Sequence, residues 1–194
     1  ADETRTYINE SAHRVEWSDN DRIVVFENNK FANSSSTTIT NGKAAFNVVF
    51  NSDLTSPSFT YNAIYPTTSF AGGNSVDLTK VELSLPSTQS ASSTSFDPAA
   101  DMLIAKPETM EKQAESITMQ FKRIVAMAKL TISNLPAGTK ISEVTFTAEG
   151  KPLAGTCIAN LNTSEISTSN NTSDSITVKY NESLTQNTPA IYFN

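Results

Sequence analysis

The sequence predicts an all-β protein of the antiparallel β-sandwich class. Short runs of β-branched and aromatic residues recur along the chain and are separated by turn residues. The composition is 38% hydrophobic but only 18% charged, and Ser, Thr and Asn fill the difference. These residues suit strands and turns better than helix interiors. No segment repeats its apolar residues with the clear period of a helix, so stacked sheets are the expected architecture.

The first half of the chain carries the clearest strand signals. Residues 22–26 (RIVVF) form an apolar run typical of a buried strand. Asn41-Gly42 is a strong signal for a two-residue hairpin turn, and Pro66 ends another apolar run. The strands expected here are residues 15–17, 22–26, 37–40, 44–50, 59–65, 81–85 and 101–105.

The second half contains the longest apolar run, residues 117–132, which is predicted to be one long strand with a kink near Arg123. Residues 141–148 alternate after one slip that resembles a β-bulge. The other strands expected in this half are residues 153–158, 176–180 and 190–193.

Three polar stretches separate these strands. Residues 87–95 and 160–173 are expected to be loops, and the charged stretch 107–116 is expected to be a linker or turn region. A domain boundary in that stretch divides the chain into an N-terminal domain, residues 1–114, and a C-terminal domain, residues 115–194.

The charge and cysteine content argue against several classes of function. The net charge is −6 and the chain has no dense basic cluster, so a nucleic-acid partner and docking on an anionic membrane are not expected. The single cysteine, Cys157, cannot form an internal disulfide or a cysteine-rich metal site, and it is expected to be buried. The chain begins with Ala1, so a processed precursor is compatible with the sequence.

No catalytic constellation is visible, and the chain is predicted not to be an enzyme. His13 is the single histidine, and no G-x-S-x-G motif accompanies it. Asp19 and Asp21 lack the further ligands of a calcium loop, so a turn before a strand explains them better. No metal or cofactor site is therefore expected.

Some side chains remain open to two interpretations from sequence. Asp97 and Asp101 are expected to be turn and strand-edge residues, although paired carboxylates for glycoside cleavage meet only in three dimensions. Trp17, Tyr61 and Tyr65 would stack on sugars if they were exposed, whereas packing in the core is the commoner role of such rings.

Several phrases, taken in order, resemble the fimbrillin family of pilus subunits. The L-x-L-P-x-x-Q step ends at Gln89, and an apolar phrase opens at Phe121. The matching phrases are 4–6 (TRT), 15–18 (VEWS), 21–26 (DRIVVF), 61–66 (YNAIYP), 83–89 (LSLPSTQ), 101–105 (DMLIA) and 121–126 (FKRIVA).

The resemblance implies a fimbrial subunit of Bacteroides-type bacteria, exported as a lipoprotein precursor to the outer membrane and displayed at the cell surface. It implies two transthyretin-like β-sandwich domains, of which the second is short or truncated here. Subunits of this type assemble by β-strand exchange after proteolysis at a basic residue, for which Arg5 is the first candidate and Arg14 the next. The implied partners are other pilin subunits, with a host surface receptor or a glycan in addition.

One further motif and two alternative functions belong with this resemblance. Asp174-Ser175-Ile176 resembles a short O-glycosylation sequon of these bacteria, with Ser175 as the acceptor. A surface glycan-binding lipoprotein and a fimbrial tip adhesin remain alternatives to a shaft pilin that mediates adhesion.

Overall fold

The computed structural model describes residues 7–9, 14–50, 57–72, 76–185 and 189–194. These residues form almost entirely β-strands, with two short 3-10 helices at Thr67–Ser69 and Pro98–Ala100. The expected all-β class is therefore confirmed. Within the described ranges, the structure has no helix of the length and apolar character that a membrane span requires.

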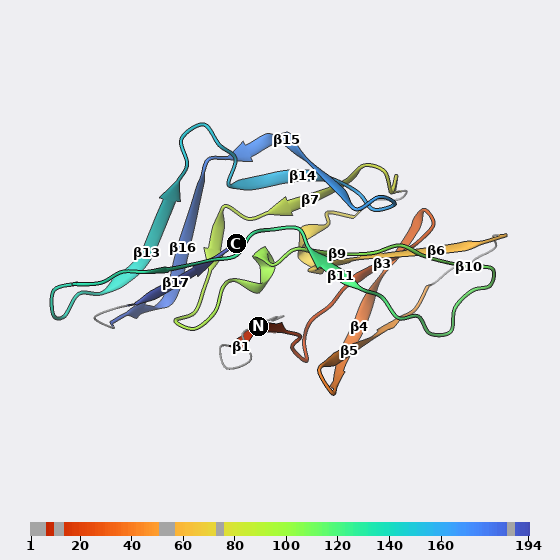
Figure 1. Ribbon diagram of the computed structural model, residues 1–194, viewed down its shortest axis with the longest axis horizontal. Coiled ribbons are helices and arrows are strands. Elements are labelled where there is room, and N and C mark those ends of the chain that lie inside the picture. The colour runs from red at the N-terminus through yellow and green to blue at the C-terminus, as the bar shows by residue number, and fades with distance from the viewer. Residues whose placement is uncertain (1–6, 10–13, 51–56, 73–75, 186–188) are drawn as a thin grey trace.

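The strands follow one another along the chain and fall into several sheets (Figure 1). In chain order they are β1 (Tyr7–Asn9), β2 (Arg14–Glu16), β3 (Val24–Glu27), β4 (Lys30–Thr40), β5 (Lys43–Val48), β6 (Phe59–Tyr65), β7 (Val81–Leu85), β8 (Thr88–Ser90), β9 (Leu103–Ala105), β10 (Glu108–Met110), β11 (Phe121–Arg123), β12 (Ala128–Thr131), β13 (Ile141–Thr147), β14 (Ala154–Asn160), β15 (Glu165–Ser173), β16 (Ser175–Leu184) and β17 (Ala190–Phe193).

The largest sheet has the strand order β11-β9-β6-β3-β4-β5, and β10 also pairs with β6. Two three-stranded sheets have the orders β13-β16-β8 and β15-β14-β7, and two-stranded sheets form from β12 with β17 and from β1 with β2. Neighbouring strands are antiparallel throughout, except that β16 and β8 run parallel. This arrangement fits the antiparallel sandwich that the sequence predicts.

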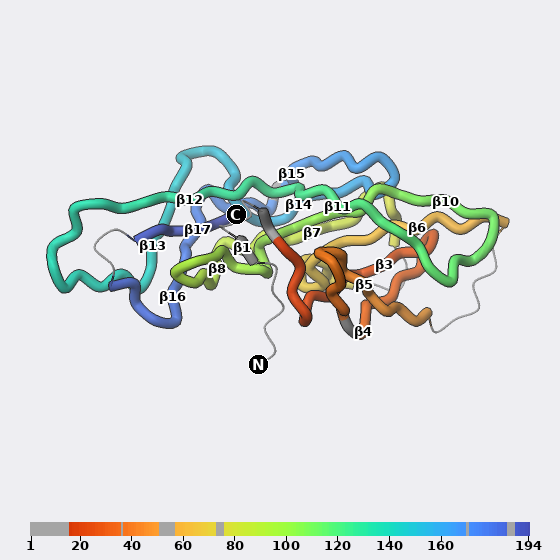
Figure 2. The backbone as a smooth tube through the Cα atoms, turned by 60° about the horizontal axis from the view of Figure 1, so that its bottom comes forward, coloured from red at the N-terminus to blue at the C-terminus, as the bar shows by residue number. Residues whose placement is uncertain are grey.

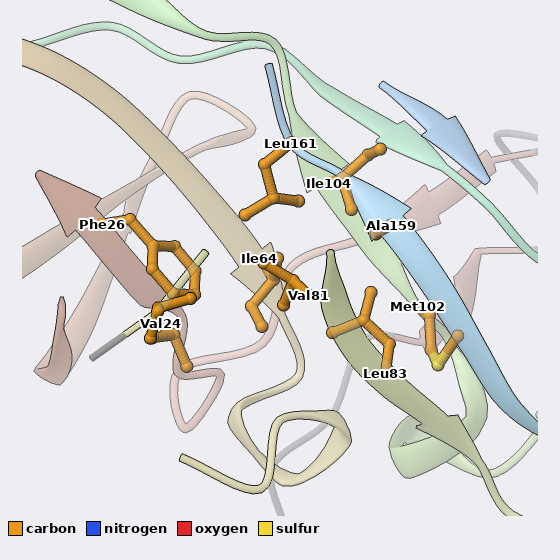
Figure 3. Packing of buried hydrophobic residues seen from close by; sticks show 10 residues of the cluster. Val24, Phe26, Ile64, Val81, Leu83, Met102, Ile104, Ala159 and Leu161 are labelled. Carbon is orange, nitrogen blue, oxygen red and sulfur yellow. The ribbon is translucent and has the colours of Figure 1, made fainter. Parts of the chain in front are cut away.

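The first hydrophobic core lies between one face of the largest sheet and the sheet that contains β7 and β14 (Figure 3). Phe26 and Ile64 point into it from β3 and β6, while Leu83 and Ala159 come from β7 and β14. All four side chains are at most 1% exposed. This face-to-face packing of two sheets is the sandwich itself.

Two further clusters complete the interior. Val25, Tyr61 and Tyr65 occupy the opposite face of the largest sheet, where partly exposed side chains cover them. Around β16, a third cluster contains Ile176, Val178, Tyr180 and Ile191 among its buried members.

Local sequence signals located several elements correctly. Thr40 lies opposite Lys43, and the Asn41-Gly42 turn between them has positive φ at both residues, 52° and 73°. That backbone is the one that two-residue hairpin turns require. β6 and β17 have the expected bounds, and the expected slip in residues 141–148 is a register shift between Ile141 and Glu143.

Three stretches that were expected to be loops or linker contain strands, so those predictions are wrong. β8 lies in 87–95, β10 in 107–116 and β15 in 160–173. These strands carry few apolar residues because β10 and β15 are largely solvent-facing, whereas β8 turns a buried glutamine inward. Hydrophobic alternation cannot detect such strands.

The single strand expected over 117–132 is also wrong, because the run divides between two sheets. β11 pairs with β9 of the largest sheet, whereas β12 pairs with β17. The expected kink near Arg123 therefore lies where the chain passes from one sheet to the other.

The domain boundary expected after residue 114 stays a prediction. β7 and β8, from the first segment, pair with β14 and β16 of the second segment, and β11 pairs back to β9. Strands from before and after residue 114 consequently pair with each other in the same sheets.

Candidate functional site

Strands β11 and β12 form a border of the molecule where each has one edge that no described strand pairs, here called the open border. Among the described strands, β11 pairs only with β9 and β12 only with β17. Figure 2 shows the two strands in succession along one side of the molecule, from the largest sheet toward the C-terminal strands. Each strand thus presents one row of main-chain N–H and C=O groups without a neighbouring strand in the described part of the chain.

The open border belongs to a long stretch with no buried residue. From Lys106 to Leu153 every side chain is exposed or half-buried, although this stretch includes the longest apolar run. Met127 is 38% exposed and Leu130 is 44% exposed. Exposed apolar side chains on an edge strand with unpaired main-chain groups are typical of a surface that another chain covers.

A shallow depression of about 440 Å³ lies beside β11. Its walls include Lys106 and Lys122 together with Phe121 and the turn at 162–164. A second depression of about 380 Å³ lies near Pro86 and Gly155. No carboxylate, histidine or cysteine lines either depression, so neither offers the acid and base groups of a catalytic pocket.

An ion pair fixes β11 to the large sheet. Arg123 donates from Nε and from Nη2 to the two carboxylate oxygens of Asp101, with an Nη2–Oδ2 distance of 2.8 Å. Asp101 is fully buried, while the Arg123 side chain is 28% exposed. The hydrogen bonds to Asp101, opposed by burial, raise the pKa of Arg123, so the guanidinium remains charged.

A second polar anchor holds the last strand. Gln89 of β8 is fully buried, and its side-chain amide both donates a hydrogen bond to the main chain of Asn194 and accepts one from it. Nε2 donates to the Asn194 oxygen over 2.7 Å, and Oε1 accepts from the Asn194 N–H over 3.1 Å. The contact joins two residues that lie 105 positions apart in the sequence and connects β8 to the residue that follows β17.

Comparison with known proteins agrees with this architecture of sheets and borders. The family model described as fimbrillin-like matches residues 4–193, which is nearly the whole chain. The chain belongs to the fimbrillin-like family. Its fold is similar to the crystal structure of a proposed cell adhesion protein from Bacteroides ovatus, with a TM-score of 0.53 and 17% identity. The match covers 97% of this chain and 74% of that chain. No functionally curated protein matches the sequence.

The three rings considered for sugar binding in this fimbrillin-like protein pack against other described residues and form no open platform there. Trp17 makes edge-to-face contacts with Phe46, Tyr65 and Phe121, with ring centroids 5.1, 5.3 and 5.4 Å apart. Tyr61 is 4% exposed and Tyr65 is fully buried. These rings therefore stabilise the core and are not available for stacking on sugars, because a sugar needs an accessible ring face.

Of the predicted processing and modification residues, the structure describes Arg14 and Ser175 but not Arg5. Arg5 lies outside the described residues, and Arg14 is the first residue of β2. Ser175 opens β16 directly after the exposed Asp174 and is itself half-buried. Its hydroxyl lies 3.3 Å from that of Ser173, so the sequon occupies the tight turn between β15 and β16.

The acidic residues considered for calcium or catalysis serve the local fold. The Asp21 carboxylate is fully buried and accepts from the Ser18 N–H over 2.7 Å and from the Tyr65 hydroxyl over 2.9 Å. The Asp97 carboxylate accepts from the Ala99 and Ser90 N–H groups. Asp21 thus fixes the turn before β3, and Asp97 caps the second 3-10 helix.

The cysteine and the metal-ligating residue types form no site in the part of the chain that the structure describes. Cys157 lies half-buried on β14, and this burial raises the pKa of its thiol. No cluster of three or more His, Cys, Asp or Glu side chains occurs among the described residues, and His13 lies outside them.

Sequence reasoning missed the roles of Gln89 and Asp101. Gln89 appeared only within a family-like phrase, and Asp101 was expected to be a strand-edge residue. Each is fully buried and holds a distant partner, so the signal would have been a polar residue surrounded by core strands. That context is visible only once the sheets are paired.

Proposed function

We propose that this fimbrillin-like protein is a structural subunit of a cell-surface fimbria, where it binds neighbouring subunits by exchange of β-strands and mediates adhesion. Membership of the fimbrillin-like family supports a pilin role, and the similar fold of a proposed adhesion protein agrees with it. The observation that carries the proposal is β12, an exposed strand that presents the apolar side chain of Leu130 and has one edge that no described strand pairs.

The physical basis is the pairing of main-chain groups at a sheet edge. An added strand satisfies the N–H and C=O groups of the open border and covers Met127 and Leu130 at the same time. When the donor segment and the acceptor edge lie on different surfaces of one subunit, the contact is heterologous and grows an open fibre. Two shallow depressions that no carboxylate, histidine or cysteine lines suit such a role better than they suit turnover of a small molecule.

The proposal includes export and processing. The protein reaches the outer membrane as a lipoprotein precursor, and a protease cuts after Arg5 before assembly. Arg14 is the alternative site, and a cut after it would fall within β2 and separate β1 from most of its partner strand. Other subunits of the same or a related kind are the primary partners, with a host receptor or glycan as a further partner.

Glycan binding is not favoured as the main function. It needs exposed aromatic faces, whereas Tyr61 and Tyr65 are buried and the Trp17 ring contacts three other rings.

The test uses the intact protein in its native host. Surface material is sheared from the cells and analysed on denaturing gels with and without boiling. We expect a ladder of multimers that collapses on boiling, because subunits joined by long rows of main-chain hydrogen bonds dissociate slowly. A Leu130→Asp variant should weaken the ladder, whereas Ser142→Asp, an exposed change on β13, should not.

Processing is tested in the same material. An Arg5→Ala variant should retain the longer N-terminus by mass spectrometry and give less ladder, while Arg14→Ala should behave as wild type. A chain that stays monomeric in the sheared material of wild-type cells would overturn the proposal.

A further inference from the structure

Gln89 occupies an unusual place for a polar side chain. β8 pairs with β16 in parallel register, and Gln89 lies opposite Val178, which is also fully buried. The surrounding cluster is apolar, with Ile176, Tyr180 and Ile191 among its members. A carboxamide in such a core is costly unless each of its polar atoms is bonded.

The bonds of Gln89 meet that requirement through main-chain groups. Its Nε2 donates to the Asn194 oxygen over 2.7 Å and lies 3.4 Å from the Pro86 oxygen. Its Oε1 accepts from the Asn194 N–H over 3.1 Å. The main-chain N–H and a main-chain oxygen of Asn194 are therefore both bonded to one side chain.

This exchange has the form of an antiparallel hydrogen-bonded pair. In such a pair, two residues on neighbouring strands give and accept one main-chain bond each. Here the Gln89 side-chain amide replaces the main chain of the neighbouring strand. β17 pairs with β12 over residues 190–193, and Gln89 bonds the main chain of the next residue, Asn194.

The side chain of Asn194 takes no part in the contact. Asn194 is 6% exposed, and neither its Nδ2 nor its Oδ1 has a hydrogen-bond partner within the described residues. Gln89 therefore recognises the strand through its main chain and not through the residue type at this position. A contact of this kind is indifferent to side-chain sequence.

We infer that Gln89 is a main-chain clamp, the positioning residue that fixes the strand in the β17 position and sets its register. In the isolated chain the clamped segment is Ala190–Asn194. In the fibre the clamp holds the strand at this position against exchange, a consequence that rests on the proposed function. The clamp itself does not depend on that function.

The first test measures amide hydrogen exchange in the purified full chain. In Gln89→Leu, amides of β17 and Asn194 should exchange at least about tenfold faster, whereas amides of β7 and β14 should keep their protection relative to the wild type. Gln89→Glu should show an intermediate increase in exchange, because its carboxylate accepts from the Asn194 N–H but cannot donate to the Asn194 oxygen. Gln113→Leu, a change at an exposed glutamine, is the matched control.

Two substitutions at Asn194 separate main-chain from side-chain recognition. Asn194→Pro removes the N–H and should accelerate exchange in β17 as Gln89→Leu does, and combining the two changes should add little. Asn194→Ala removes only the unpartnered amide and should leave the protection of β17 intact or increase it. Loss of protection in Asn194→Ala, or unchanged protection of β17 in Gln89→Leu, would overturn the clamp.

The fibre consequence has a separate readout. Fibres of Gln89→Leu subunits should dissociate in detergent at a lower temperature than wild-type fibres. Faster exchange in β17 with unchanged fibres would overturn that consequence. Absence of any wild-type ladder would instead overturn the proposed fimbrial role, and the clamp would stand on the exchange data alone.

Discussion

The ion pair between Arg123 and Asp101 offers the sharpest test of how β11 is held. In Arg123→Met, the aliphatic part of the side chain is largely kept while both hydrogen bonds to Asp101 disappear. The Asp101 carboxylate is fully buried, so it would lose its charge partner in a place that water does not reach. Breaking a buried pair in this way is far more harmful than replacing both members.

The magnitude follows from the burial of the two partners. Loss of one member of a fully buried pair costs about 3–5 kcal/mol. The Arg123 side chain is 28% exposed, so solvent already screens part of the attraction and reduces the cost to the lower end of this range or just below it. We expect Arg123→Met to lower the free energy of unfolding by about 2–3 kcal/mol. The double variant Asp101→Asn with Arg123→Met should recover at least about 1 kcal/mol of this, because no buried charge then remains.

Urea denaturation followed by circular dichroism measures these differences from the transition midpoint at constant slope. Lys122→Met is the matched control, since Lys122 is the exposed neighbour on β11 and should change stability by less than about 0.5 kcal/mol. The reasoning is refuted if Arg123→Met is as stable as Lys122→Met, or if the double variant is no more stable than Arg123→Met.

Four other outcomes are expected. Burial raises the pKa of Tyr180 to about 12, and its hydroxyl has no partner within the described residues. The unfolded chain releases this proton near pH 10, so folding stability should decline as pH rises from about 10 to 12, and Tyr180→Phe should remove that decline in alkaline denaturation curves. Asn62 is fully buried and its amide is likewise unpartnered in the described part, so Asn62→Leu should raise the urea midpoint, by about 1 kcal/mol or more in free energy; a lower midpoint would show that the amide is satisfied. Leu83→Ala, in the first core, should cost about 2–5 kcal/mol by the same method, and a loss below that range would mean that the two sheets close the cavity. If Ser175 carries an O-glycan, the intact mass of the protein from its native host should exceed the sequence mass and return to it in Ser175→Ala; equal masses would remove the modification.

Local patterns predicted those parts of the fold whose structure is decided by neighbouring residues. The turn at Asn41-Gly42 is one example, because positive φ at two successive positions is a property of the residues themselves. β6 is another, since its run of apolar residues is buried on both faces and ends at Pro66. In both places, sequence and structure agree without reference to any distant partner.

Distant pairing decided the parts that sequence reasoning missed. Nothing in the apolar run 117–132 shows that Phe121 pairs with Ala105 while Leu130 pairs with Ile191. β15 is polar throughout most of its length because it is an edge strand, and it is recognisable only from its register with β14. The same limit applies to the site, where the resemblance indicated the family but not that Gln89 bonds a residue 105 positions away.

The placement of Trp17 gives the molecule a built-in optical probe. It is the single tryptophan of the chain, and its ring lies between Phe46 of β5, Tyr65 of β6 and Phe121 of β11. Any event that moves the N-terminal segment away from this sheet changes the polarity around one indole. The emission wavelength of the unlabelled protein can therefore follow the proposed processing and subunit joining in real time.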